Sequence, residues 1–113
     1  MILRAKGIVA SENGSWLHFD FTPGEQNIRE NYLKPFEIAV KHYKGTPLAV
    51  MSSFNFIGTQ PSTANKYLLN DVLRGEWGFV GMVETDYDGS YGYMISDKSV
   101  RNGNDLMLGF GMA

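Results

Sequence analysis

Three short segments carry side chains that could do chemistry, and each follows or closes a predicted strand. They are residues 51–55 (Met-Ser-Ser-Phe-Asn), residues 84–87 (Glu-Thr-Asp-Tyr) and Asp105. A carboxylate in such a position can act as a nucleophile, a general base or a metal ligand, and aromatic neighbours suit the apolar faces of sugar rings. Because an acid at a strand end is also a common loop cap or ion-pair partner, spacing alone leaves these roles open.

Asp86 is the leading candidate because it lies at the end of a β-prone apolar run, residues 78–87, that is typical of a buried strand. Glu84 would share a strand face with Asp86, since alternate residues of a strand point the same way. A carboxylate pair is therefore feasible, although a structural or buried-pair role is favoured for Glu84. Asp88 could complete an acidic metal site with Asp86, but two loop acids without a nearby histidine are a weak metal signal. No metal or other cofactor is expected.

Several other chemistries lack their motif in this sequence. The chain has no cysteine, no Gly-x-Ser-x-Gly nucleophile elbow and no Gly-x-x-x-x-Gly-Lys-Ser/Thr phosphate loop. Residues 88–93 look superficially like a phosphate loop, but their tyrosines and position favour an ordinary loop. Ten basic and twelve acidic residues give a net charge of −2 without a run of one sign. Neither a nucleic acid nor a membrane is therefore expected as a partner.

The composition predicts a single domain. A chain of 113 residues with 43% apolar side chains can bury one hydrophobic core. Its N-terminus lacks the apolar segment of a signal peptide, and no apolar run is long enough to span a membrane. The expected location is cytoplasmic.

The first 24 residues are predicted to form a β-hairpin. Residues 2–9 and 15–21 are apolar and β-prone. The pair Asn13-Gly14 between them tolerates the positive φ angles of a tight turn.

After residue 24 the apolar spacing changes to that of a helix. A stripe at intervals of three to four residues predicts an amphipathic helix from Glu25. The stripe consists of Ile28, Tyr32, Phe36, Ala39, Val40 and Tyr43. Pro35 should kink or divide this helix, with the second piece beginning near Lys34.

The rest of the chain alternates between helices and short strands. Ser62 or Asn65 can cap a second helix, and a third should cover residues 95–102. The expected strands are residues 48–51, 80–86 and 105–108. This order predicts a parallel α/β layer.

Four spaced segments of residues 25–113 resemble family 3 glycoside hydrolases, in the family's order. They are residues 29–37 (RENYLKPFE), 50–58 (VMSSFNFIG), 69–87 (LNDVLRGEWGFVGMVETDY) and 101–108 (RNGNDLML). The resemblance implies an α/β fold, namely about three β/α units from the end of a (β/α)8 barrel, here preceded by the hairpin. It also implies the activity of a retaining, exo-acting β-glycosidase.

The resemblance implies roles for four residues. Asp86 matches the nucleophile, whose carboxylate attacks the anomeric carbon to form a glycosyl-enzyme intermediate. Tyr87, Phe54 and Met51 fall at substrate-binding positions, so a carbohydrate is the expected partner. Tyr87 stands where many members carry Trp, and Phe54 stands where many carry Tyr.

Much of the family's machinery lies outside these 113 residues. By resemblance, earlier barrel strands bring sugar-binding side chains and a second domain brings the general acid/base, so the isolated chain is expected to be inactive. Residues 1–24 instead resemble a hairpin from the C-terminal domain of cobalamin-synthesis-type metallochaperone GTPases, which suggests a separate origin. One alternative is a non-enzymatic, recombined module that forms homo-oligomers through uncovered strand edges. Another is a carbohydrate-binding remnant without catalysis.

Overall fold

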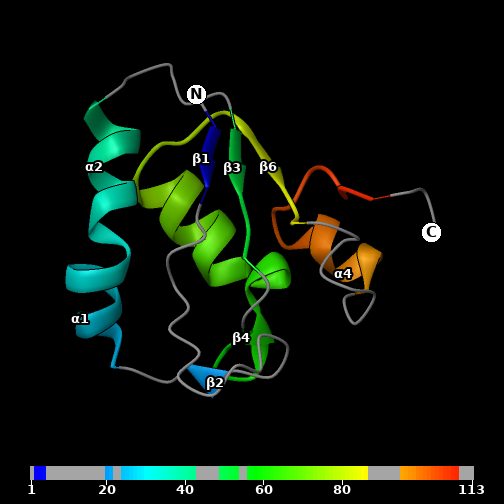
Figure 1. The fold of residues 1–113 in the computed structure, drawn as a ribbon, viewed down its shortest axis with the longest axis horizontal. Helices are drawn as coiled ribbons and strands as arrows, with labels where there is room; N and C mark the ends of the chain where they lie inside the picture. The colour runs from blue at the N-terminus through cyan, green and yellow to red at the C-terminus, as the bar shows by residue number, and fades with distance from the viewer. Residues whose placement is uncertain are drawn as a thin grey trace.

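A three-stranded parallel sheet lies at the centre of the computed structural model. The described residues are 2–4, 20–21, 24–42, 49–53, 56–86 and 95–109. The strand order is β1 (Ile2–Arg4), β3 (Ala49–Met51) and β6 (Met82–Glu84), with β3 in the middle (Figure 1). Leu106 adds a parallel bridge to Glu84 on the other side of β6. The predicted parallel α/β layer is confirmed.

A second, smaller sheet lies beyond the end of β3. In it, β2 (Asp20–Phe21) pairs in parallel with β4 (Phe56–Ile57), which pairs in the antiparallel direction with β5 (Gln60–Pro61). The two-residue turn between β4 and β5 begins at Gly58, whose φ of +60° suits glycine. Our sequence analysis did not predict this hairpin.

The predicted hairpin of residues 1–24 is wrong where its ends are described. Residues 2–4 pair with β3 and residues 20–21 pair with β4, so the two expected arms end in different sheets. A two-stranded hairpin alone is marginally stable, whereas an apolar strand that extends a larger sheet also gains packing. Residues 5–19, the middle of the expected hairpin, lie outside the described part of the chain.

The chain from Glu25 forms two successive helical pieces. The first consists of α1 (Glu25–Asn27) and the π-helical η1 (Ile28–Tyr32), and the second is α2 (Lys34–His42). Pro35 lies in the first turn of α2, where its missing N–H removes no helical hydrogen bond. The predicted break near Lys34 is confirmed.

The helix η3 (Tyr67–Glu76) is capped by Asn65, one of the two predicted caps. The side-chain oxygen of Asn65 accepts a hydrogen bond from the backbone N–H of Leu68 at 3.1 Å. The other predicted cap position opens the short 3-10 helix η2 (Ser62–Ala64). Beyond η3, Gly78 has a φ of +73°, which turns the chain toward β6.

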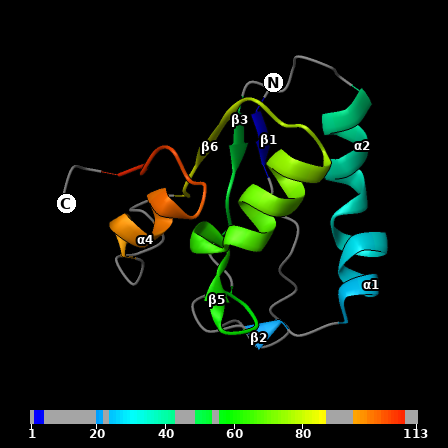
Figure 2. The ribbon, with the colours of Figure 1, turned by 180° about the vertical axis from the view of Figure 1, so that it is seen from behind.

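The apolar core lies between the helices and one face of the sheet. Figure 2 shows η3 passing in front of the sheet, with α2 beside it. The central cluster consists of Val40, Val50, Leu69, Leu73, Phe79 and Val83. Full burial of such a side chain contributes about 1.5–3 kcal/mol. Packing, rather than the propensity of these short helices, therefore holds the layer together.

The remaining helix, α4 (Ser96–Arg101), confirms the third predicted helix. The buried hydroxyl of Ser99 donates to the carbonyl of Thr63 at 2.8 Å and joins α4 to η2. The strand expected at residues 105–108 is reduced to the single bridge at Leu106. Within the described ranges, no helix is both long and apolar enough to cross a bilayer.

Gly103→Ala is expected to destabilise the fold more than two control substitutions. Gly103 has a φ of +107°, and an added Cβ would lie 2.4 Å from Oδ1 of Asn70 and 3.0 Å from Cβ of Leu69. Strain and overlap together should lower the free energy of unfolding in urea by about 2–4 kcal/mol. Gly58→Ala has open space and should lose only about 1–2 kcal/mol. Gly24→Ala, with open space and a φ of −54°, should be nearly neutral; equal effects at all three positions would contradict this account.

Candidate active site

The carboxyl ends of β3 and β6 lie side by side, and polar residues follow both strands. Met51 is in register with Glu84, and the backbone N–H of Ser52 donates to the Glu84 carbonyl at 2.8 Å. In parallel α/β folds, functional side chains gather at this edge of the sheet. The register thus brings together two of the three candidate segments, residues 51–53 and residues 84–86.

Asp86 is the second residue after β6 and is half-buried. Burial alternates along this stretch: Val83 and Thr85 are fully buried, whereas Glu84 and Asp86 each keep part of their surface exposed. Val83 packs into the core, so Glu84 and Asp86 share the opposite, more open face of the strand. This is the geometry that a carboxylate pair would require.

The predicted substrate-binding residues differ in what the structure describes. Met51 ends β3 and is 6% exposed, so it has little surface available for a ligand in this chain. Phe54 and Tyr87 lie outside the described residues, as does Asp88, and their roles stay predictions. Within the part that is described, no group of three or more His, Cys, Asp and Glu side chains could hold a metal ion.

Asp105, the third candidate, is exposed, but its carboxylate is bonded to other groups of this chain. Its Oδ2 accepts hydrogen bonds from Nη2 of Arg74 at 2.6 Å and from the backbone N–H of Val83 at 2.7 Å. Arg74 also donates to the Gly81 carbonyl at 2.9 Å, and its guanidinium lies 5.6 Å from the centre of the Phe79 ring. Asp105 thus has the structural role that is common for an acid at a strand end, that of an ion-pair partner. It joins η3 to β6.

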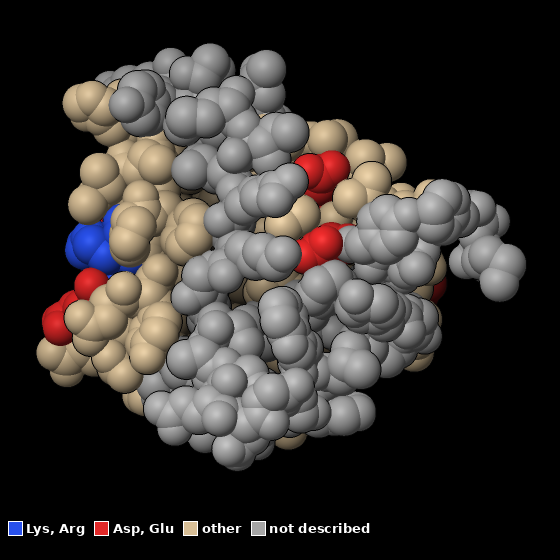
Figure 3. Space-filling model, viewed as in Figure 1, with Lys and Arg blue, Asp and Glu red and all other residues tan. Residues whose placement is uncertain are grey.

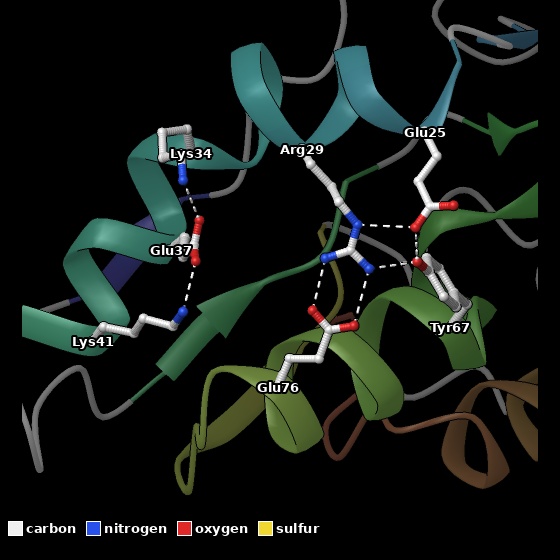
Figure 4. A network of polar contacts seen from close by, with 7 residues as sticks. All are labelled: Glu25, Arg29, Lys34, Glu37, Lys41, Tyr67 and Glu76. Atoms are coloured by element: carbon white, nitrogen blue, oxygen red, sulfur yellow. Dashed lines mark hydrogen bonds and ion pairs between the residues drawn. The ribbon is translucent and has the colours of Figure 1, made fainter.

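Figure 4 shows a polar network between helices that our sequence analysis did not predict. Arg29 donates to both carboxylate oxygens of Glu76, at 2.7 and 2.9 Å, and to Glu25 at 2.9 Å. The Tyr67 hydroxyl accepts a hydrogen bond from Arg29 and donates one to Glu25, both at 2.5 Å. The network therefore ties α1 and η1 to both ends of η3.

These contacts shift the pKa of each group further from pH 7. Arg29 lowers the pKa of the Glu76 carboxyl, and the Tyr67 hydroxyl and Arg29 lower that of Glu25. The hydrogen bond to Glu25 raises the pKa of Tyr67, and Glu76, Tyr67 and Glu25 raise that of Arg29. Each group is thus held in the protonation state that it already has at pH 7, which suits a strut between helices rather than an acid–base site.

A second network in Figure 4 lies within α2. The Glu37 carboxylate pairs with Lys34 at 2.8 Å and with Lys41 at 2.6 Å. These two ammonium groups lower the pKa of Glu37 to about 2. Since all three side chains are solvated and belong to one helix, the network supports α2 only weakly.

Charged atoms of the described residues are visible in two places on the face drawn in Figure 3. In Figure 3, basic and acidic atoms lie together on the α1 side. On the β6 side, acidic atoms are visible without basic atoms of the described residues beside them.

Comparison with known proteins assigns this arrangement to a family. The sequence profile of the "Glycosyl hydrolase family 3 N terminal domain" matches residues 4–107. The chain belongs to glycosyl hydrolase family 3. The matched range includes all three candidate segments. It also includes most of residues 1–24, for which a separate origin stays a prediction.

Relatives in family 3 are clearly similar in sequence and much longer. Beta-glucosidase B of Emericella nidulans is 50% identical over 66 residues, which are 58% of this chain and 8% of that protein. Beta-glucosidase A of Butyrivibrio fibrisolvens is 40% identical over 92 residues, which are 81% of this chain and 10% of that protein. This family 3 chain thus spans a tenth or less of the length of these relatives.

Solved structures share the α/β arrangement. Beta-glucosidase 3B from Thermotoga neapolitana, in complex with glycerol, matches with a TM-score of 0.74 and 39% identity over 82% of this chain and 12% of its own. Beta-glucosidase from Kluyveromyces marxianus, in complex with glucose, matches with a TM-score of 0.74 and 31% identity over 83% of this chain and 11% of its own. The described elements thus have the backbone arrangement of a family 3 segment.

Glu76→Gln should reduce thermal stability at pH 7 and have little effect at about pH 2. Arg29 lowers the pKa of Glu76 in the folded chain below its ordinary value of 4.5. The stabilising contribution is therefore complete above about pH 4.5 and is lost as the pH falls through the folded-state pKa. Melting followed by circular dichroism should show a difference in Tm that closes on acidification. Arg101→Gln, which breaks an exposed pair within α4, is the control and should change Tm little at either pH; a pH-independent effect of Glu76→Gln would refute the linkage.

Proposed function

We propose that this chain is the nucleophile-bearing segment of a retaining, exo-acting β-glycosidase. The observation that carries the proposal is the place of Asp86, directly beyond β6, on the open face of a parallel sheet, in a member of glycosyl hydrolase family 3. The relatives named above are beta-glucosidases, which favours a β-linked glucoside as the carbohydrate substrate.

In the proposed reaction, the Asp86 carboxylate forms a bond to the anomeric carbon while the bond to the leaving group breaks. A second carboxyl group, about 5 Å away in retaining enzymes, protonates the departing oxygen. It then removes a proton from the water that cleaves the glycosyl ester and frees Asp86. We assign that second carboxyl to a part of the family's longer proteins that these 113 residues do not include.

The proposed scaffold is the end of a (β/α)8 barrel. Two observations support it: β1, β3 and β6 run parallel, and α2 and η3 cover one face of the sheet. In such barrels the chemistry takes place at the carboxyl ends of the strands, which is where Asp86 lies.

The proposed substrate contacts come from the same edge. Tyr87 and Phe54 would offer aromatic faces to the sugar ring. Met51, which is buried and in register with Glu84, would line the wall of the sugar site behind these aromatic rings. It would contribute little direct contact with the sugar.

The isolated chain is proposed to be inactive, and self-association is the alternative role. β1 has a strand partner on only one side among the described residues, and an open strand edge can pair with another chain. A homo-oligomer formed in this way would need no catalytic function.

Purified chain is expected to show no turnover of aryl β-glucosides, because one carboxylate without its partner acid gives little transition-state stabilisation. The measurement compares aryl release by wild type and Asp86→Ala, with light scattering on the same samples. Turnover that disappears in Asp86→Ala would overturn the proposed inactivity. A strictly monomeric wild type would count against association through the β1 edge.

The nucleophile role can be tested in a full-length context. The matching segment of Beta-glucosidase B from Emericella nidulans would be replaced by that of this chain, and the chimera is expected to hydrolyse aryl β-glucosides. Asp86→Ala in the chimera should lower kcat by at least about 10⁴-fold.

Azide should restore turnover to the Asp86→Ala chimera. The azide anion would bond to the anomeric carbon from the vacant nucleophile face as aryloxide leaves, giving the α-glucosyl azide. Glu84→Gln is the control for loss of a neighbouring charge and should not produce an azide adduct. Absence of the α-azide product from an otherwise active chimera would refute the role of Asp86.

A further inference from the structure

The Asn104 side chain lies behind the candidate site and joins two strand ends. It is 1% exposed. Its Oδ1 lies 3.0 Å from the Ser52 hydroxyl, and its Nδ2 donates to the Leu106 carbonyl at 2.9 Å. Both ends of this amide are therefore engaged, one with the residue after β3 and the other with the residue that bridges to β6.

The two partners of Asn104 hold opposite ends of one peptide group. The Glu84 carbonyl accepts from the Ser52 backbone N–H at 2.8 Å and lies 3.0 Å from its hydroxyl. That hydroxyl has one proton, which it can donate to either Glu84 or Asn104. The N–H of Thr85, at the other end of the same peptide group, donates to the Leu106 carbonyl at 2.9 Å. Hydrogen bonds from Ser52 and to Leu106 thus hold both ends of the Glu84–Thr85 peptide group, which Thr85 separates from Asp86.

The Thr85 hydroxyl extends these contacts to Asp86. It donates to the Asp86 carbonyl at 2.8 Å and accepts from the Leu108 backbone N–H at 3.0 Å. Thr85 is fully buried, so these bonds lie on the closed side of the strand. The Glu84–Thr85 peptide group and the Asp86 carbonyl are consequently held on the closed side of the strand, and Asp86 belongs to the more open face.

We propose that Asn104 is a positioning residue for Asp86, acting through Ser52 and the Leu106 carbonyl to fix the Glu84–Thr85 peptide group. This proposal rests on the proposed function in one respect only: the positioned carboxylate is taken to be a nucleophile. A carboxylate that attacks carbon needs its approach held within a fraction of an ångström, and backbone fixed by buried hydrogen bonds provides this without using the reacting face.

A purely structural role predicts a different pattern, and the chain contains a matched control. Ser99 is as buried as Ser52, and its hydroxyl also donates to a backbone carbonyl, that of Thr63 at 2.8 Å. Within the described residues this hydroxyl bonds neither to β6 nor to Asn104. The Asn104 N–H donates instead to the Ser99 backbone carbonyl at 3.1 Å, a bond that removal of the hydroxyl leaves in place. Loss of either serine hydroxyl should weaken the fold, but only loss of Ser52 should disturb Asp86.

The test is NMR of the full chain with labelled aspartate and threonine. Three-bond couplings report the χ1 rotamers of Asp86, and amide exchange reports the Thr85 N–H. Wild type should show one dominant Asp86 rotamer. Asn104→Leu and Ser52→Ala should give averaged couplings and about tenfold faster exchange of the Thr85 amide. Ser52→Thr, which keeps the hydroxyl, should restore the wild-type values, and Ser99→Ala should leave them unchanged.

Three results would overturn the proposal. They are an Asp86 that is already rotamer-averaged in wild type, couplings that are unchanged in Ser52→Ala, and equal changes in Ser99→Ala. If Asn104→Leu does not fold, the serine variants decide alone. None of these readouts needs turnover, so a failed azide rescue in the chimera would remove the nucleophile role and leave the positioning result standing.

Discussion

The parallel pairing of β3 with two strands distant in sequence constrains the rest of this structure. Because β1, β3 and β6 run in the same direction, the chain must cross back over the sheet between them and cannot turn tightly. The helical pieces from α1 to α2 make the first crossing and η3 makes the second. The core contacts of Val50 and Val83 with these helices then set which strand face is buried. The opposite face is the one on which Asp86 stands.

The buried polar residues at the strand ends follow from the same constraint. Strand ends leave peptide groups without ladder partners, and a buried group that lacks a partner costs about 1–3 kcal/mol. Ser52, Thr85 and Asn104 supply those partners within the described edge of the sheet. Asp105 and Arg74 do the same nearby, with an ion pair that joins η3 to β6. The same side chains therefore provide hydrogen-bond partners for the free peptide groups and hold Asp86 in position.

Patterns within a few residues were sufficient to predict helix boundaries. They failed for strand pairing and inter-helix contacts, which depend on segments distant in sequence. The break near Lys34 and the cap at Asn65 depend on residues within a turn of each other, so they could be predicted from the sequence. The ends of the expected N-terminal hairpin were wrong, because pairing with β3 and β4 competes with the local turn. The Arg29 network joins residues from separate helices, and no spacing rule detects such a contact before the helices are packed.

The proposed orientation of Asp86 and the stabilisation of transition-state charge have different structural origins, which makes family membership compatible with the proposed inactivity. The groups that hold Asp86 lie between residues 52 and 108, at or beside the ends of β3 and β6. A short chain can therefore retain them. The groups that stabilise a glycosyl transition state must surround the sugar, including a second carboxyl about 5 Å from the first. They have to converge from many segments of a protein roughly ten times longer than this one. A chain of this length can thus keep the proposed nucleophile well aimed and still lack the charged groups that would make its attack fast.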